Sequence, residues 1–127
     1  RNGVATLVSF ISPYREKRAA VRKEIENFIE VFVDCPVEVC EERDIKGMYK
    51  KARAGIIKDF TGVNDPYEAP ENPEVTIYTD KENIDQCAEK IIKSLQDLNL
   101  VEKQAKQVYN KEEEVKIKER LKSLGYL

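Results

Sequence analysis

The sequence has 127 residues, of which 41% are apolar and 36% charged, and its 22 basic and 24 acidic residues give a net charge of −2. A chain of this length forms about one domain with a modest core, and its balanced charge favours neither a nucleic-acid binder nor an acidic tail protein. No apolar run reaches about 18 residues and no signal-peptide pattern opens the chain, so we expect no membrane partner and no leader.

Three cysteines, Cys35, Cys40 and Cys87, are present and histidine is absent. An odd number of cysteines within segments of strand or helix character favours reduced thiols and a cytosolic protein over a disulfide framework. Without histidine or closely spaced cysteine pairs, a structural zinc site is not expected. The chain begins at Arg1 rather than at an initiator methionine, so we expect a fragment, or the ordered part, of a longer polypeptide.

Three apolar runs, residues 4–10, 28–35 and 74–79, have the length and composition of parallel strands covered on both faces. A helix is expected after the first, with Ser12 as its N-cap and Pro13 at its first position. Helices over residues 36–44 and 84–98 are expected after the second and third strands, the latter with capping-box spacing at Thr79 and Glu82. This alternation predicts right-handed βαβ crossovers and an α/β fold with a parallel sheet.

Two segments interrupt this alternation of strands and helices. Residues 46–58 carry five basic side chains and no acid, and residues 59–74 hold three of the five prolines and five carboxylates. A cationic segment beside a turn-rich loop is typical of a lid that closes on polyphosphate, and the alternative is a solvated helix face. Residues 102–127 are highly charged, and we expect an appended helix over residues 111–124 with Gly125 as its C-cap.

Candidate binding residues lie after the first expected strand and in the turn-rich loop. Ligands of doubly wound sheets bind beyond the carboxyl ends of strands, and the stretch ISPYR, residues 11–15, lies at such an end. There a helix start offers free N–H groups to an anion and Arg15 could add a bidentate clamp, or Ser12 and Pro13 only cap a helix beside a solvated arginine. Phe60 could stack on a base or plug the loop from below, and Cys40 and Cys87 are most simply small core residues.

Longer motifs carry a resemblance to a known family. The stretches SFISPYREKR, RDIKGMYKKARAG and FTGVNDPYEAP, found in this order within residues 3–100, resemble the C-terminal part of adenylylsulfate kinase. The resemblance implies a P-loop-kinase-type α/β fold over residues 1–101, without its N-terminal P-loop half and with a lid at about residues 44–74. It also implies transfer of the γ-phosphate of ATP to the 3′-hydroxyl of adenylylsulfate, in a cytoplasmic homodimer, with Mg²⁺ whose ligands lie outside this chain.

The resemblance assigns roles to particular residues. Those at the family's adenylylsulfate-contacting positions are Ile11, Ser12, Pro13, Tyr14, Arg15, Glu16, Lys46, Asp59 and Phe60, and those at its ATP-binding positions are Arg43, Glu82 and Cys87. Ser12 also stands where a phosphoserine intermediate is described in the family, whereas direct in-line transfer needs no covalent step.

This sequence departs from the family pattern in several places. Ile56 and Asn64 replace acids usual in the family, and no glycine pair has the P-loop spacing G-x-x-x-x-G-K-[ST]. The acidic strand-end motif and the Arg/Asn helix of the N-terminal half are also absent. A non-catalytic sulfonucleotide-binding or regulatory module is therefore the alternative to an active kinase, and an intact or degraded P-loop upstream would distinguish the two.

Overall fold

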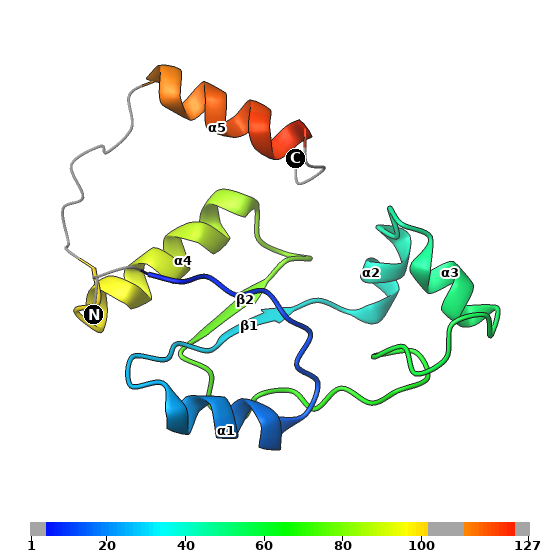
Figure 1. Ribbon diagram of the computed structural model, residues 1–127. Helices are drawn as coiled ribbons and strands as arrows, with labels where there is room; N and C mark the ends of the chain where they lie inside the picture. The colour runs from blue at the N-terminus through cyan, green and yellow to red at the C-terminus, as the bar shows by residue number, and fades with distance from the viewer. Residues whose placement is uncertain (1–4, 102–110, 124–127) are drawn as a thin grey trace.

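A computed structural model describes residues 5–101 and 111–123 of the chain. Its elements are, in order, α1 (Arg15–Glu24), β1 (Val31–Asp34), α2 (Val37–Glu42), α3 (Met48–Arg53), β2 (Val75–Tyr78), α4 (Ile84–Asp97) and α5 (Lys111–Ser123) (Figure 1). Within the described ranges no helix is long and apolar enough to cross a membrane. The three cysteines are free thiols, as expected from their number and placement.

The two strands form a parallel pair, which confirms the predicted α/β class. Val31 lies opposite Val75 and Asp34 opposite Tyr78, so that the connection from β1 to β2 runs through α2, α3 and the turn-rich loop. Both strands begin and end within a few residues of the predicted runs, where β-branched and aromatic side chains favour the extended backbone.

The core lies between this strand pair and α4. Val75 and Ile77 of β2, each 6% exposed, pack with Cys87 of α4, which is 8% exposed. Ile29, Val31 and Ile91 extend this cluster. Burial of one such aliphatic side chain stabilises the fold by about 1.5–3 kcal/mol, so these few contacts hold α4 on the sheet.

The opposite face of the sheet is covered by α1 and the turn-rich loop. The ring of Phe32, which points away from the α4 side, stacks on Tyr67 with 6.2 Å between centroids, and the guanidinium of Arg18 lies 5.8 Å from the Tyr67 centroid. Figure 1 accordingly shows α1 and α4 on opposite sides of the strand pair. The start of α1 lies toward the end of the sheet at which β1 leads into α2.

The prediction of a strand over residues 4–10 is wrong for the part that the structure describes. Residues 5–10 form no strand, and Leu7 and Phe10 are 92% and 81% exposed. A parallel strand needs a hydrogen-bonding neighbour and cover on both faces, and in the described ranges the only paired strands are β1 and β2. The expected βαβ unit that begins with this strand is therefore not formed, and the parallel crossover joins β1 to β2 instead.

Two helix starts also differ from prediction. α1 begins at Arg15 after Tyr14, and Ser12, with φ of +40°, makes no capping hydrogen bond. α4 is capped by a reciprocal pair, in which Gln86 N donates to Asn83 Oδ1 and Asn83 N donates to Gln86 Oε1, each at 2.9 Å. Thr79 cannot take this role, because its N–H still donates to the Asp34 carbonyl of the strand ladder.

The apolar stripe predicted for α4 is only partly covered. Cys87 is buried and Ile91 and Leu95 are half-buried, whereas Ile84 and Ile92 are exposed, and the main contacts of α4 are with β2. The tail forms α5 as predicted, and the side chains of residues 113–123 are exposed. The proposed C-cap Gly125 lies outside the described residues.

Candidate functional site

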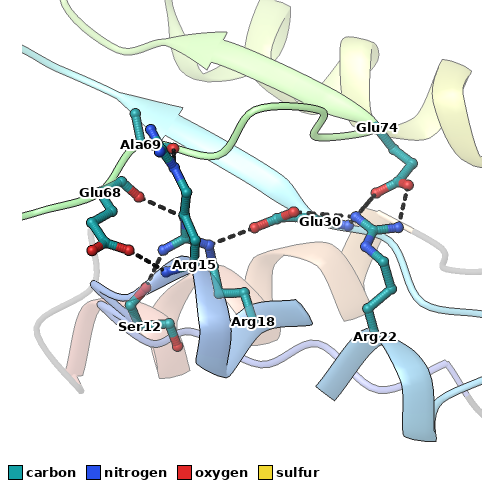
Figure 2. Close-up of polar contacts among 8 residues, drawn as sticks. All are labelled: Ser12, Arg15, Arg18, Arg22, Glu30, Glu68, Ala69 and Glu74. Atoms are coloured by element: carbon teal, nitrogen blue, oxygen red, sulfur yellow. Dashed lines mark hydrogen bonds and ion pairs between the residues drawn. The ribbon is translucent and has the colours of Figure 1, made fainter. Parts of the chain in front are cut away.

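The expected substrate stretch, residues 11–16, is tied to the turn-rich loop. The Tyr14 hydroxyl donates to Asp65 Oδ2 at 3.2 Å, and the Glu68 amide donates to the Pro13 carbonyl at 2.9 Å. The Arg15 amide in turn donates to Glu68 Oε2 at 2.7 Å (Figure 2). Two segments about fifty residues apart in sequence therefore form one surface.

Arg15 and the start of α1 are already engaged by this loop. Arg15 Nε donates to the Ala69 carbonyl at 2.7 Å, and its Nη1 lies 3.2 Å from Glu71 Oε1. The Glu68 carboxylate accepts from a backbone N–H that was expected to be open to an anion, which suits the positive end of the helix dipole. An incoming anion would have to exchange with these carboxylates, and the half-exposed Arg15–Glu71 pair is the easier of the two to open.

The hydroxyl of Tyr14 is held as a hydrogen-bond donor. The negative charge of Asp65, together with the hydrogen bond that its carboxylate accepts, raises the pKa of Tyr14 above its ordinary value. The phenol therefore stays protonated at neutral pH and can bind a ligand only as a neutral group.

Behind this surface, two arginines of α1 bind two glutamates that flank the strands. Arg18 Nε pairs with Glu30 Oε1 at 2.7 Å, and Arg22 contacts Glu30 Oε2 at 3.1 Å and both oxygens of Glu74 at 2.5 and 2.9 Å (Figure 2). The hydrogen bond from Arg22 lowers the pKa of Glu74, and the same contact raises the pKa of Arg22. This network fixes α1 against the starts of β1 and β2.

The residues expected to bind ATP lie together at the end of β2. Arg43, which follows α2, donates through Nη2 to the Thr79 carbonyl at 2.7 Å. Glu82 Oε2 accepts from the Tyr78 amide at 3.2 Å, and the Cys87 thiol lies 3.7 Å from the same oxygen. The parallel pairing of β1 and β2 brings these side chains, which follow different strands, to one edge.

The electrostatics of this edge differ between its carboxylate and its thiol. A contact with Lys90 lowers the pKa of Glu82, so this group is charged at neutral pH. Burial, and then the charge of Glu82, raise the pKa of the Cys87 thiol, which is therefore a neutral packing group. Cys87 fits its simplest interpretation as a small core residue.

The cationic segment folds into the short helix α3 with an acidic residue at its start. Asp44 accepts backbone hydrogen bonds from Met48 at 2.8 Å and from Lys50 at 3.0 Å. Burial opposes ionisation of Asp44, but the amide N–H groups of Lys50, Tyr49 and Met48 outweigh it and lower the pKa of this carboxyl. Lys46 lies in the turn between Asp44 and α3 and is exposed, which leaves its ammonium group accessible.

The aromatic residue of the loop packs against α3. The Phe60 ring meets Tyr49 edge to face, with 4.9 Å between centroids, and Phe60 is half-buried, so part of the ring stays accessible. Its neighbour Asp59 is exposed, with φ of +55°. Asn64, one of the departures from the family pattern, accepts from Phe60 N at 2.6 Å and donates through Nδ2 to the Ile57 carbonyl at 3.3 Å. A carboxylate could not make the second bond, because it lacks a donor.

Two surface hollows lie away from most of the expected site residues. One hollow of about 430 Å³ lies between β2 and the second half of α4, and another of about 300 Å³ lies along α4 beside Glu82. Of the predicted site residues, only Glu82 lines either of them. Within residues 5–101 and 111–123, no group of three or more Cys, Asp or Glu side chains is placed to hold a metal ion.

Arg18 and Glu68 contribute to this surface although the sequence interpretation gave neither a role. Their contacts join residues of α1 to a loop, which no local pattern reveals. The sequence did contain one signal, a pair of arginines four residues apart, Arg18 and Arg22, on one expected helix. Residues at this spacing lie on the same helix face, and the domain also carries an acidic loop that such a face could bind.

The comparisons with known proteins agree on one family. The family profile described as adenylylsulphate kinase matches residues 1–78. The adenylyl-sulfate kinase of Synechococcus sp. (strain JA-3-3Ab) is 59% identical over 95 residues, covering 75% of this chain and 54% of that protein. That of Halothermothrix orenii is 54% identical over 97 residues, covering 76% of this chain and 52% of that protein.

A solved structure gives the same result for the fold. The structure of the Mycobacterium tuberculosis APS kinase in complex with AMPPNP and APS superposes with a TM-score of 0.64 at 44% identity, covering 68% of this chain and 52% of that one. The chain therefore belongs to the adenylylsulfate kinase family and has a P-loop-kinase-type α/β fold. It spans about half the length of the curated relatives it matches.

Proposed function

We propose that the complete polypeptide carrying these residues is an adenylylsulfate kinase. It transfers the γ-phosphate of ATP to the 3′-hydroxyl of adenylylsulfate and gives 3′-phosphoadenylylsulfate and ADP. The observation that carries this proposal is the joining of residues 11–16 to residues 65–71, in a chain of this family, by hydrogen bonds at Pro13, Tyr14 and Arg15. These are the segments in which family resemblance places substrate contacts and the lid.

Each group of residues has a proposed role. Adenylylsulfate is bound by Ile11, Ser12, Pro13, Tyr14, Arg15, Glu16, Lys46, Asp59 and Phe60, and ATP by Arg43, Glu82 and Cys87. The accessible part of the Phe60 ring stacks on the substrate adenine, and Lys46 offsets negative charge that develops on the transferring phosphoryl group.

The transfer itself is a direct in-line displacement. The 3′-oxygen attacks the γ-phosphorus, the bond to the β,γ-bridging oxygen breaks, and the hydroxyl proton is released as ADP leaves. Mg²⁺ accompanies ATP in kinase chemistry and neutralises phosphate charge. Ser12 serves this reaction by shaping the backbone of the substrate stretch, and no phosphoserine is required.

The remaining features are proposed by family resemblance. Residues 1–101 form the C-terminal part of a kinase domain that works as a cytoplasmic homodimer, and residues 102–127 are an appendage outside the catalytic unit. Its ligands are the nucleotides ATP and adenylylsulfate, and the charge balance of the chain does not favour nucleic acid.

Transfer of ³²P from [γ-³²P]ATP to adenylylsulfate by the complete polypeptide tests this proposal. If the protein is a kinase, ³²P should appear at the 3′ position of the product, and only when adenylylsulfate is present. Saturable adenylylsulfate binding without label transfer would instead support the non-catalytic module, and absence of both would overturn the whole proposal.

A further inference from the structure

We propose that Arg18 is a positioning residue that holds the substrate stretch in its binding conformation; this inference rests on the proposed function. Arg18 lies on α1 outside the expected contact set, and its side chain is 11% exposed. Its guanidinium joins three separate parts of the chain, which no other described arginine of α1 does.

The contacts of Arg18 converge on the backbone of the site. Nη1 donates to the Ser12 carbonyl and Nη2 to the Glu68 carbonyl, each at 2.5 Å, while Nε pairs with Glu30 at 2.7 Å (Figure 2). The same group lies over the ring of Tyr67. One planar fork therefore fixes the substrate stretch, the turn-rich loop and the start of β1 relative to one another.

The backbone at Ser12 explains why such a clamp is needed. Ser12 has φ of +40°, a left-handed conformation that a non-glycine residue keeps only when its surroundings impose it. The hydrogen bond from Arg18 holds the carbonyl of this residue, and the Pro13 carbonyl is held by the Glu68 amide. Loss of the Arg18 fork leaves Ser12 free to relax, and residues 11–16 then move away from the loop.

Arg22 provides a matched control on the same helix. It lies one turn further along and also pairs with Glu30, and it binds Glu74 through two hydrogen bonds. Within the described part of the chain, the hydrogen bonds and ion pairs of Arg22 reach neither Ser12 nor Glu68. Replacement of Arg22 removes comparable ion pairs from α1 but leaves the contacts of residues 11–16 in place. This variant therefore distinguishes a loss of positioning from a general loss of stability.

The test compares Arg18→Met, Arg18→Lys and Arg22→Met in the complete polypeptide. The affinities for adenylylsulfate and for a non-hydrolysable ATP analogue are measured by calorimetry, and the unfolding midpoint is measured in parallel. Arg18→Lys keeps the charge beside Glu30 but lacks the planar fork, so it remains informative if Arg18→Met does not fold.

We expect Arg18→Met to weaken adenylylsulfate binding between about tenfold and a hundredfold, because small misplacements of binding groups have effects of this size. Arg18→Lys should weaken it to a lesser extent, and Arg22→Met should leave it within about twofold while lowering the unfolding midpoint. Binding of the ATP analogue should stay within about twofold throughout.

Two results would overturn the inference. Unchanged adenylylsulfate affinity in both Arg18 variants, or equal weakening by Arg22→Met, would mean that Arg18 only stabilises the fold. Failure of the unmodified polypeptide to bind adenylylsulfate would instead reject the proposed function, and the inference with it.

Discussion

Phe60 is half-buried and packs against α3. Its ring meets Tyr49 edge to face, and its amide is fixed by Asn64. The two interpretations of this residue, a stacking platform and a plug beneath the loop, are therefore compatible in geometry. The two interpretations differ in which ligand loses affinity when the ring is removed.

Replacement of Phe60 by alanine should weaken adenylylsulfate binding more than ATP binding. Stacking of a base on an aromatic ring contributes about 1–3 kcal/mol, which corresponds to a loss of roughly five- to 150-fold in affinity. Calorimetric titration of both nucleotides measures this difference. Phe60→Leu is the control, since it fills the space beside Tyr49 without an aromatic face. Equal loss for both nucleotides in Phe60→Ala, or full recovery in Phe60→Leu, would assign Phe60 to packing.

Lys46 is the accessible cation at the start of the lid. Lys46→Ala should lower the turnover number by about tenfold to a thousandfold, because a charge that stabilises the transition state is lost. Lys23→Ala, a change on the exposed side of α1, should leave turnover unaltered. A steady-state kinase assay compares the two variants. An unchanged turnover number in Lys46→Ala would mean that the cationic segment is only a solvated helix face.

Individual residues were predicted unevenly. The binding roles of Asp59 and Phe60 were inferred from a family motif and stay predictions. The cap of α4 at Asn83 and Gln86 was overlooked, although Asn-x-x-Gln before an apolar helix is a recognisable signal. Ser12 was expected to cap α1 and instead takes a left-handed conformation. The carbonyl of Ser12 accepts a hydrogen bond from Arg18, a contact that no local rule describes.

At the scale of elements, α1 is attached to the sheet chiefly through charged side chains. Val21 of α1 and Ile25, which directly follows the helix, are exposed, while Arg18 and Arg22 bind Glu30 and Glu74. The stability of this attachment should therefore depend on pH rather than on apolar burial alone.

Glu74→Gln should lower the stability of the protein at pH 7 by about 1 kcal/mol, since it removes one partner of a half-buried ion pair. The pKa of Glu74 is lowered in the folded state, chiefly by the hydrogen bond from Arg22. Its contribution is thus fully present above the unfolded value of about 4.3 and is lost as pH falls through the folded value.

The difference between wild type and Glu74→Gln should therefore close as the pH is lowered below this window. Urea unfolding at pH 7 and at acidic pH measures it, with Glu71→Gln on the same loop as the control, because Glu71 is exposed. A difference that stays constant with pH would contradict a role for the Glu74 charge.

Among the apolar runs, those that pack on the core were predicted correctly as elements, whereas residues 5–10 form no strand. β1, β2 and α4 follow their apolar patterns, because Val75, Ile77 and Cys87 pack on one another. Residues 4–10 carry an equally apolar pattern, yet Leu7 and Phe10 are exposed. Pattern alone specifies that a segment can be a strand, and pairing in the described chain decides whether it is one.

At the scale of the molecule, two long-range associations organise the chain. The parallel pairing of β1 and β2 gathers Arg43, Glu82 and Cys87 at one edge. The contacts of Tyr14 and Arg15 with the turn-rich loop assemble the second surface. The parallel sheet was predicted from local patterns, and family motifs grouped the candidate residues, but the particular contacts within each group were not predicted, because they join residues far apart in the chain.

The central claim is that residues 11–16 and 65–71 form one adenylylsulfate-binding surface. Hydrogen exchange of the complete polypeptide, followed by mass spectrometry of peptides from both segments, tests it most directly. We predict that adenylylsulfate slows exchange in both segments together, including at the amides of Arg15 and Glu68, and that an ATP analogue alone does so much less. Protection by adenylylsulfate in other parts of the protein, with neither segment affected, would contradict the account.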